Sequence, residues 1–174
     1  MKTFRAFAAA LIASSLAAAT SAAQSADTPS GFPVPRFVSL KSEKTNGRIG
    51  PSLQHETRWL VQREGLPVLV IAESGEAWRK IRDPEGDEMW VHALRVSGRA
   101  TAIVTAGAPL DVRRSADPAS DLKARLAPGV IVEILSCEAA RCRVKAEGQR
   151  GFVDAGRLWG PTDAQAAVRA ASLD

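Results

Sequence analysis

The chain has 174 residues, of which 45% are hydrophobic, enough for one ordinary domain or for two small ones. It contains 23 Lys and Arg residues and 19 Asp and Glu residues, and basic and acidic residues are interspersed along the sequence, as in residues 76–88. A nucleic-acid-binding protein needs its basic residues clustered, often beside stacking aromatics. The charge pattern therefore argues against a nucleic-acid partner.

The first 23 residues have the pattern of a secretory signal peptide. Lys2 and Arg5 precede an apolar, Ala-rich stretch at 6–19, and small residues at 21–23 offer a cleavage site. The apolar stretch is too short to span a membrane, which disfavours the alternative of an uncleaved anchor. We expect cleavage after Ala23, a periplasmic or secreted protein, and no membrane span after removal of the signal. Cleavage would leave a surplus of only two positive charges.

The rest of the sequence is typical of a mostly β protein. Residues 24–36 are rich in Pro, Ser and Gly and are expected to form a linker. Short apolar runs separated by turn residues follow. Strands are expected at 37–41, 59–61, 66–73, 77–82 and 89–92. TNGRIGPS (45–52) is expected to form the long first loop and DPEGDE (83–88) a polar turn.

An internal repeat divides this β region in two. MWVHALRVSG (89–98) aligns without gaps with GFVDAGRLWG (151–160). The other matching pairs are EGLPVLVI (64–71) with PGVIVEIL (128–135), WRKIR (78–82) with RCRVK (141–145), and TNGRIGPS with LDVRRSAD (110–117). The repeat predicts two copies of one β-unit, each a small barrel of about five strands. TAIVTAGAP (101–109) is expected to connect them, and 161–174 to form a C-terminal tail.

The same motifs resemble a known family. PVPRFVSLKS, the NxRxGPS core of TNGRIGPS, GLPVLVIAE, WRKIRD and WVH, in that order, resemble the bacterial SH3-like domain and its exported, tandem members. The resemblance covers most of residues 33–160 and is closer in the first copy. It implies an all-β fold of two tandem SH3-like barrels, at 37–98 and 99–160, in a protein of the cell envelope.

Three positions of the first copy depart from the family pattern, as do Ala116, Asp117 and Arg141 of the second. The family motif has apolar residues on both sides of its Asn and a Gly before its Trp, whereas this chain has Thr45, Gly47 and Met89 there. We therefore expect the segment around Asn46 to bury less and to be more mobile. A phosphate-binding loop is the less favoured interpretation of TNGRIGPS, because the Walker Lys and a following helix are both missing.

The candidate ligand-binding residues lie on two neighbouring strands. If Ile81 and Val91 point into the barrel, alternation places the other side chains of these strands together on the outer face. The candidates are Trp78, Lys80, Arg82, Trp90 and His92, with Arg48 from the loop nearby. Aromatic platforms beside polar groups suit peptides or sugars. The alternative is that both Trp side chains only pack against the first loop or the second domain.

The second copy differs at this face. It carries Arg141, Arg143 and Lys145 opposite Phe152 and Asp154, so it should bind the same ligand poorly, bind a more acidic one, or act as a spacer. Trp159 is placed to pack between the domains, and Trp59 is expected in the core.

Cys137 and Cys142 are expected to form a disulfide, as an even number of cysteines at short spacing does in an exported protein. A zinc site would need about four ligands, and His55 and His92 lie far away in sequence. No Ser or Cys has an evident His and acid context. No catalytic residue, metal site or cofactor is therefore predicted.

The resemblance implies a non-catalytic protein that binds peptidoglycan, its peptides or an envelope protein. A scaffold or accessory subunit of an envelope enzyme complex is the alternative, and a weak cell-wall hydrolase is a more remote third.

Overall fold

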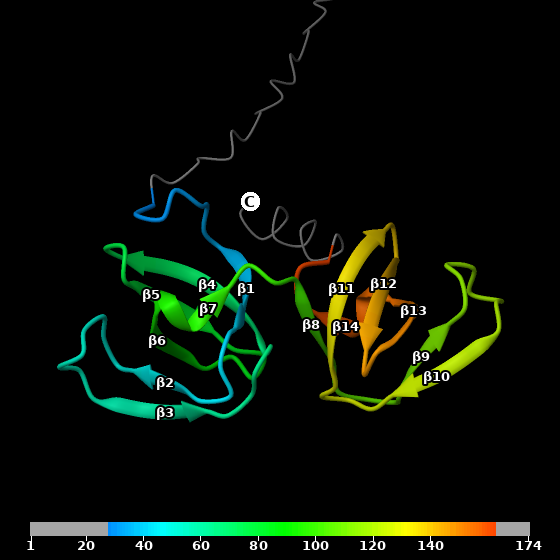
Figure 1. Ribbon diagram of the computed structural model, residues 1–174, viewed down its shortest axis with the longest axis horizontal. Coiled ribbons are helices and arrows are strands. Elements are labelled where there is room, and N and C mark those ends of the chain that lie inside the picture. Colours follow the sequence, from blue (N-terminus) through cyan, green and yellow to red (C-terminus); the bar gives the residue numbers. More distant parts are fainter. Residues whose placement is uncertain (1–27, 163–174) are drawn as a thin grey trace, which may run out of the picture.

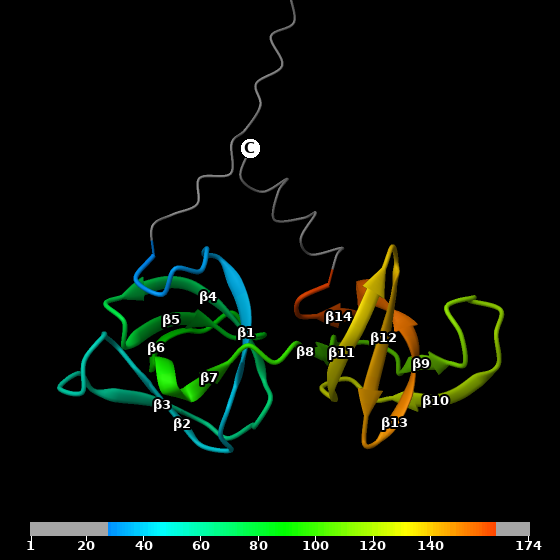
Figure 2. The ribbon, with the colours of Figure 1, turned by 45° about the horizontal axis from the view of Figure 1, so that its top comes forward.

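The computed structural model describes residues 28–162, so the expected signal peptide and nearly all of the expected tail lie outside it. The described chain forms two antiparallel sheets of seven strands, each curled into a small barrel (Figures 1 and 2). This confirms the predicted all-β fold of two tandem barrels, with more strands than the expected five. Within residues 28–162, no helix is long and apolar enough to cross a membrane.

The two barrels have the same topology. The strands of the first are β1 (Arg36–Leu40), β2 (Thr45–Arg48), β3 (Thr57–Val61), β4 (Pro67–Ser74), β5 (Trp78–Arg82), β6 (Glu88–His92) and β7 (Val96–Ser97). Those of the second are β8 (Thr101–Val104), β9 (Leu110–Arg113), β10 (Leu122–Leu126), β11 (Ile131–Glu138), β12 (Arg141–Ala146), β13 (Gln149–Asp154) and β14 (Leu158–Trp159). The sheet orders, β3-β2-β6-β5-β4-β1-β7 and β10-β9-β13-β12-β11-β8-β14, become identical when shifted by seven strands. The structure thus confirms the internal repeat.

Two segments expected to be irregular are strands. Thr45–Arg48 of TNGRIGPS forms β2, so the loop begins only at Ile49. Thr101–Val104, expected within the connection, forms β8 of the second sheet. Both strands have four residues, too few for alternation to be evident, and Asn and Gly in β2 are typical of turns. Tertiary pairing with β3 and β6 overrides that local preference.

Each barrel has its own apolar core. The first is built from Leu40, Leu66, Val68, Val70, Ile81, Met89 and Val91. The second is built from Ala102, Val104, Leu110, Val112, Val132, Cys142, Val144, Val153, Ala155 and Leu158. Ile81 and Val91 are fully buried, as expected, and Trp59 packs against the first core.

Two residues of the segment around Asn46 are buried, although we expected this segment to bury less. Thr45 is fully buried, although its hydroxyl has no hydrogen-bond partner among residues 28–162, and Gly47 is buried as well. A Cβ atom on Gly47 would lie 2.5 Å from the Met89 sulfur, so Met89 fills the space that a side chain at 47 would need. The two departures from the family motif therefore compensate each other.

The second barrel has the same pair with the sizes exchanged. The repeat alignment places Val112 at the position of Gly47, and Gly151 at the position of Met89. A Cβ atom on Gly151 would lie 2.3 Å from Val112 Cγ1. In each domain only one of the two facing strands can carry a side chain at this point.

The barrels are packed against each other. Ile103, Ile131 and Trp159 of the second barrel contact the core of the first, and Trp159 meets Phe37 edge to face with ring centroids 5.0 Å apart. The Thr101 hydroxyl donates a buried hydrogen bond of 2.8 Å to the Gly65 carbonyl oxygen. This confirms the expectation that Trp159 packs between the domains. β1 and β8 lie at this junction (Figure 1).

The described part of the expected linker, residues 28–36, contacts the first barrel through Glu73, and its last residue, Arg36, begins β1. The Glu73 side chain is 1% exposed and accepts hydrogen bonds from the Ser30 backbone and hydroxyl, while Arg36 and Arg79 form ion pairs with it. Burial alone raises the pKa of Glu73, but the hydrogen bonds from Arg36 and Ser30 outweigh it and leave the pKa lowered.

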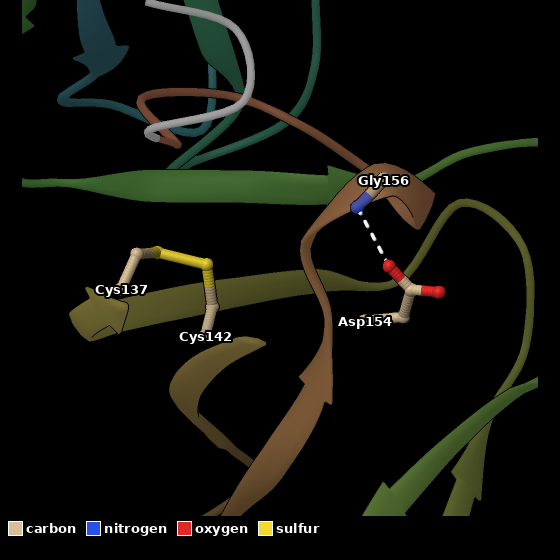
Figure 3. Close-up of a disulfide and its surroundings, with 4 residues drawn as sticks. All are labelled: Cys137, Cys142, Asp154 and Gly156. Atoms are coloured by element: carbon tan, nitrogen blue, oxygen red, sulfur yellow. Dashed lines mark hydrogen bonds between the residues drawn. A yellow bond between two sulfur atoms is a disulfide. The ribbon is translucent and has the colours of Figure 1, made fainter. Parts of the chain in front are cut away.

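The predicted disulfide is present. Cys137 and Cys142 face each other in the register of β11 and β12, and their sulfur atoms are bonded (Figure 3). The bridge fits the oxidising compartment expected for the protein. It closes the end of one hairpin and is not what joins the two domains.

The steric fit between Gly47 and Met89 can be tested by a double-mutant cycle. Gly47→Val should lower the free energy of unfolding by about 2 kcal/mol through overpacking, and Met89→Gly by about 3 kcal/mol through a cavity. The double variant reproduces the Val112–Gly151 arrangement and should lose about 2 kcal/mol less than the sum of the singles. Denaturant unfolding measures all four proteins. Strictly additive losses would contradict the close approach.

Replacing both cysteines by Ala should cost about 2 kcal/mol of stability, because a ring closed over so few residues restricts the unfolded chain only modestly. Denaturant unfolding of the variant beside the oxidised protein measures the cost. Intact-mass measurement of the wild type should show a gain of two hydrogens on reduction. A mass unchanged by reduction would show that the bridge does not form.

Glu73 should make stability depend on pH in a defined direction. Its pKa in the folded protein lies below the ordinary 4.5, so its contribution is complete above pH 4.5 and is lost as pH falls through the folded pKa. Glu73→Gln should therefore reduce the free energy of unfolding by about 2 kcal/mol at neutral pH. The gap between variant and wild type should close in acid. A gap that is constant with pH would mean that the charge of Glu73 is not involved.

Candidate functional site

The five candidate side chains on β5 and β6 share one face of the hairpin, as predicted. The register pairs Trp78 with His92 and Lys80 with Trp90, and none of these residues alternates into the core occupied by Ile81. Arg48 on β2 is paired with Trp90 on the other side. The six candidate residues therefore lie on three adjacent strands.

A groove of about 700 Å³ is lined by some of the six candidate residues but not by all of them. Its lining consists of Lys44, Asn46, Arg48, Leu53, Leu60, Trp78, His92, Leu94 and Arg95. Three candidates, Arg48, Trp78 and His92, belong to it. Trp90, Lys80 and Arg82 lie outside the lining. We call this feature the β2–β6 groove.

Lys80 and Arg82 already have an anionic partner. Both form ion pairs of 2.6 Å with Glu88, the first residue of β6. The hydrogen bond from Lys80, and then that from Arg82, holds the pKa of Glu88 below its usual range. The sequence analysis placed Glu88 in a solvated turn and missed this pairing. The two cations are therefore less available to a ligand than their type indicates.

His92 also has a structural contact. Its ring lies edge to face with Trp78, with centroids 5.4 Å apart. His92 Nδ1 accepts a 3.2 Å hydrogen bond from the Leu94 backbone and so caps the short 3-10 helix Ala93–Arg95. The cap places Leu94, whose side chain is 74% exposed, and Arg95 at the rim of the groove.

The second domain makes the same cap with a different residue. Asp154 accepts a 2.9 Å hydrogen bond from the Gly156 backbone and caps the 3-10 helix Ala155–Arg157 (Figure 3). Both caps could have been predicted from the sequence, because Asp is a common capping residue and the repeat aligns Asp154 with His92.

Arg48 braces the loop after β2. Its guanidinium donates to the carbonyl oxygens of Leu53 (3.2 Å) and His55 (2.6 Å). The His55 ring lies over Gly50, where a Cβ atom would come within 2.4 Å of it. The loop leads into β3 rather than a helix, so it lacks the helix N-terminus that a phosphate loop requires.

Ser52 and His55 form a hydrogen-bonded pair that the sequence analysis did not recognise. The Ser52 hydroxyl lies 2.8 Å from His55 Nδ1, on the exposed side of the loop. No carboxylate of residues 28–162 is hydrogen-bonded to the His55 ring, so the pair lacks the orienting acid of a triad. The same part of the chain contains no group of three or more potential metal ligands.

The equivalent face of the second domain has a different chemistry. Arg141 replaces Trp78 and lies opposite Asp154, and Arg143 lies opposite Phe152, as predicted. Asp111 replaces Asn46 and forms ion pairs with Arg113 (3.1 Å) and Arg125 (3.0 Å). This face therefore supplies its own counter-charge and has no aromatic residue where the first domain has Trp78.

Sequence reasoning missed six residues of the groove, namely Lys44, Asn46, Leu53, Leu60, Leu94 and Arg95. Leu60 could have been found, because it alternates with the half-buried Trp59 on the same strand. The others lie in β2 or in connections whose path the sequence does not specify.

Two small β-barrels with an open groove on the first define a tandem SH3-like architecture. A family model described as "Bacterial SH3 domain" matches residues 41–98 and again 106–160. The chain belongs to this family, as the resemblance implied.

Two solved structures illustrate more distant similarity. They are NlpC2 and NlpC1 from Trichomonas vaginalis, each 10% identical with a TM-score of 0.33. The alignments cover 74% and 71% of this chain, and 49% and 45% of those chains. The chain thus spans about half the length of these structures. A search of curated proteins finds no match.

Proposed function

We propose that the protein is an exported, non-catalytic binding protein of the cell envelope that recognises peptidoglycan through its peptides. The β2–β6 groove of the first domain is the binding site. Family membership and the disulfide support an extracytoplasmic role. The groove is the observation that carries the proposal.

The groove has the features of a peptide site. It combines the Trp78 ring with three exposed leucines and polar groups from Asn46 and His92. Exposed apolar side chains beside an aromatic platform bury the flat and aliphatic parts of a peptide, while the polar groups fix its orientation. The exposed leucines are Leu53 (69%), Leu60 (53%) and Leu94 (74%).

A binding role also accounts better than catalysis for the titratable groups. His92 is engaged in capping, and Glu88 is neutralised by two cations. A catalytic cleft usually holds a nucleophile or an acid within hydrogen-bond reach of a base. The groove lining contains no Ser, Thr, Cys, Asp or Glu.

Trp78 and Trp90 provide a matched pair of variants. Both lie on the outer face of the hairpin, but only Trp78 lines the groove. In a pull-down of the full mature chain on purified peptidoglycan sacculi, Trp78→Ala should reduce retention about tenfold, because stacking on an aromatic side chain is lost. Trp90→Ala should reduce it less than twofold.

Thermal unfolding of both variants serves as the control for folding. An equal loss of retention with both substitutions would show that the binding site is the whole outer face of the hairpin rather than the groove. No retention of the wild type on sacculi would contradict wall binding and favour the scaffold role. Release of soluble fragments from the sacculi would contradict the non-catalytic assignment.

A further inference from the structure

The charge of the β2–β6 groove has one sign. Its lining contains Lys44, Arg48 and Arg95, and it contains no Asp or Glu. None of these three basic side chains takes part in an ion pair with another residue of the described chain, 28–162. Lys44 and Arg95 are exposed, whereas Arg48 is half-buried and braces the adjacent loop. The groove thus presents three positive charges for which its own lining supplies no counter-charge.

Four other cations of the same domain have acidic partners. On the same domain, Lys80 and Arg82 are paired with Glu88, and Arg36 and Arg79 with Glu73. These cations lie outside the groove and have partners. Within residues 28–162, Lys41, Arg58 and Arg63 also form no ion pair, but they lie outside the groove. The groove is distinguished by three cations that line one cavity without an acidic residue.

The second domain provides an internal comparison. Asn46 of the groove becomes Asp111, which pairs with Arg113, the equivalent of Arg48, and with Arg125, the equivalent of Leu60. His92 becomes Asp154. In the second domain an acidic side chain of the same fold therefore pairs with the cations at this position, whereas the first domain has the uncharged Asn46 there.

We propose that the β2–β6 groove selects peptides that carry free carboxylates over the same peptides with their carboxylates amidated. This inference rests on the proposed function and specifies the ligand class of its site. Lys44 and Arg95 at the rim are the selecting residues, while Trp78 and the leucines contact the uncharged parts of the peptide. A carboxylate accepts charge-assisted hydrogen bonds from ammonium and guanidinium groups, whereas a carboxamide has no net charge to offer them.

The test compares two synthetic peptides with the full mature chain. One is the tetrapeptide L-alanyl-γ-D-glutamyl-L-lysyl-D-alanine, and the other has the glutamyl α-carboxylate and the C-terminal carboxylate amidated. Binding measured by calorimetry or by fluorescence of the Trp residues should be about tenfold weaker for the amidated peptide. The difference should shrink as salt is raised, because the contacts lie at the solvent-exposed rim.

Two double variants locate the effect. Lys44→Gln with Arg95→Gln should reduce the preference to less than twofold. The matched control, Arg143→Gln with Arg150→Gln, removes the same net charge from exposed positions of the second domain and should leave the preference unchanged. All four positions are exposed, so the substitutions should leave the unfolding temperature nearly unaltered.

The outcomes separate the inference from the proposed function. Equal affinity for both peptides in the wild type would overturn the inference and leave wall binding intact. Loss of preference in the control variant would show that selectivity is a long-range charge effect rather than a property of the groove, and would also overturn the inference. Retention on sacculi without binding of either peptide would overturn it as well, whereas failure of sacculus retention would remove the proposed function itself.

Discussion

The close approach of β2 and β6 is the constraint on which the first domain depends. Arg48 and Trp90 are opposite each other in this pairing, and the residue preceding each one competes for the same interior space. Because Gly47 has no side chain, the Met89 side chain can occupy this space. The two strands can then pair and close the barrel under the groove. If both residues were large, the strands would separate, and Arg48 could no longer brace the loop that forms one wall of the site.

The second barrel meets the same constraint in the opposite way, with Val112 and Gly151. Gly47 and Met89, two departures of the first copy from the family motif, therefore fit together sterically. Each departure taken alone indicates a defect, either a missing apolar side chain or an oversized one. Together they conserve volume, and close-packed interiors tolerate volume-conserving exchanges far better than single changes. The consequence is a paired strand β2 with Thr45 and Gly47 buried, where the motif comparison predicted a loosened loop.

Much of the fold was predictable because the repeat, the strand alternation and the cysteine spacing are all local or periodic signals. The outward face of Trp78 and Trp90 followed from alternation alone. The groove did not, because its walls come from connections: Leu53 is positioned by the hydrogen bonds of Arg48, and Leu94 by the cap on His92. Glu88 was missed for the same reason. Its role depends on where the turn ends, and strand boundaries are weakly encoded in a short polar segment.

The division of work between the domains follows from their interface and their charges. The second domain contributes Ile103, Ile131 and Trp159 to the first core, so the two barrels stabilise each other and the second is more than a spacer. On its equivalent face Asp111 replaces Asn46 and pairs with Arg113 and Arg125, and Arg141 replaces Trp78. The two features on which we base the proposed peptide site are therefore absent from that face. The two copies therefore share one architecture, while the groove that we propose as the binding site lies on the first.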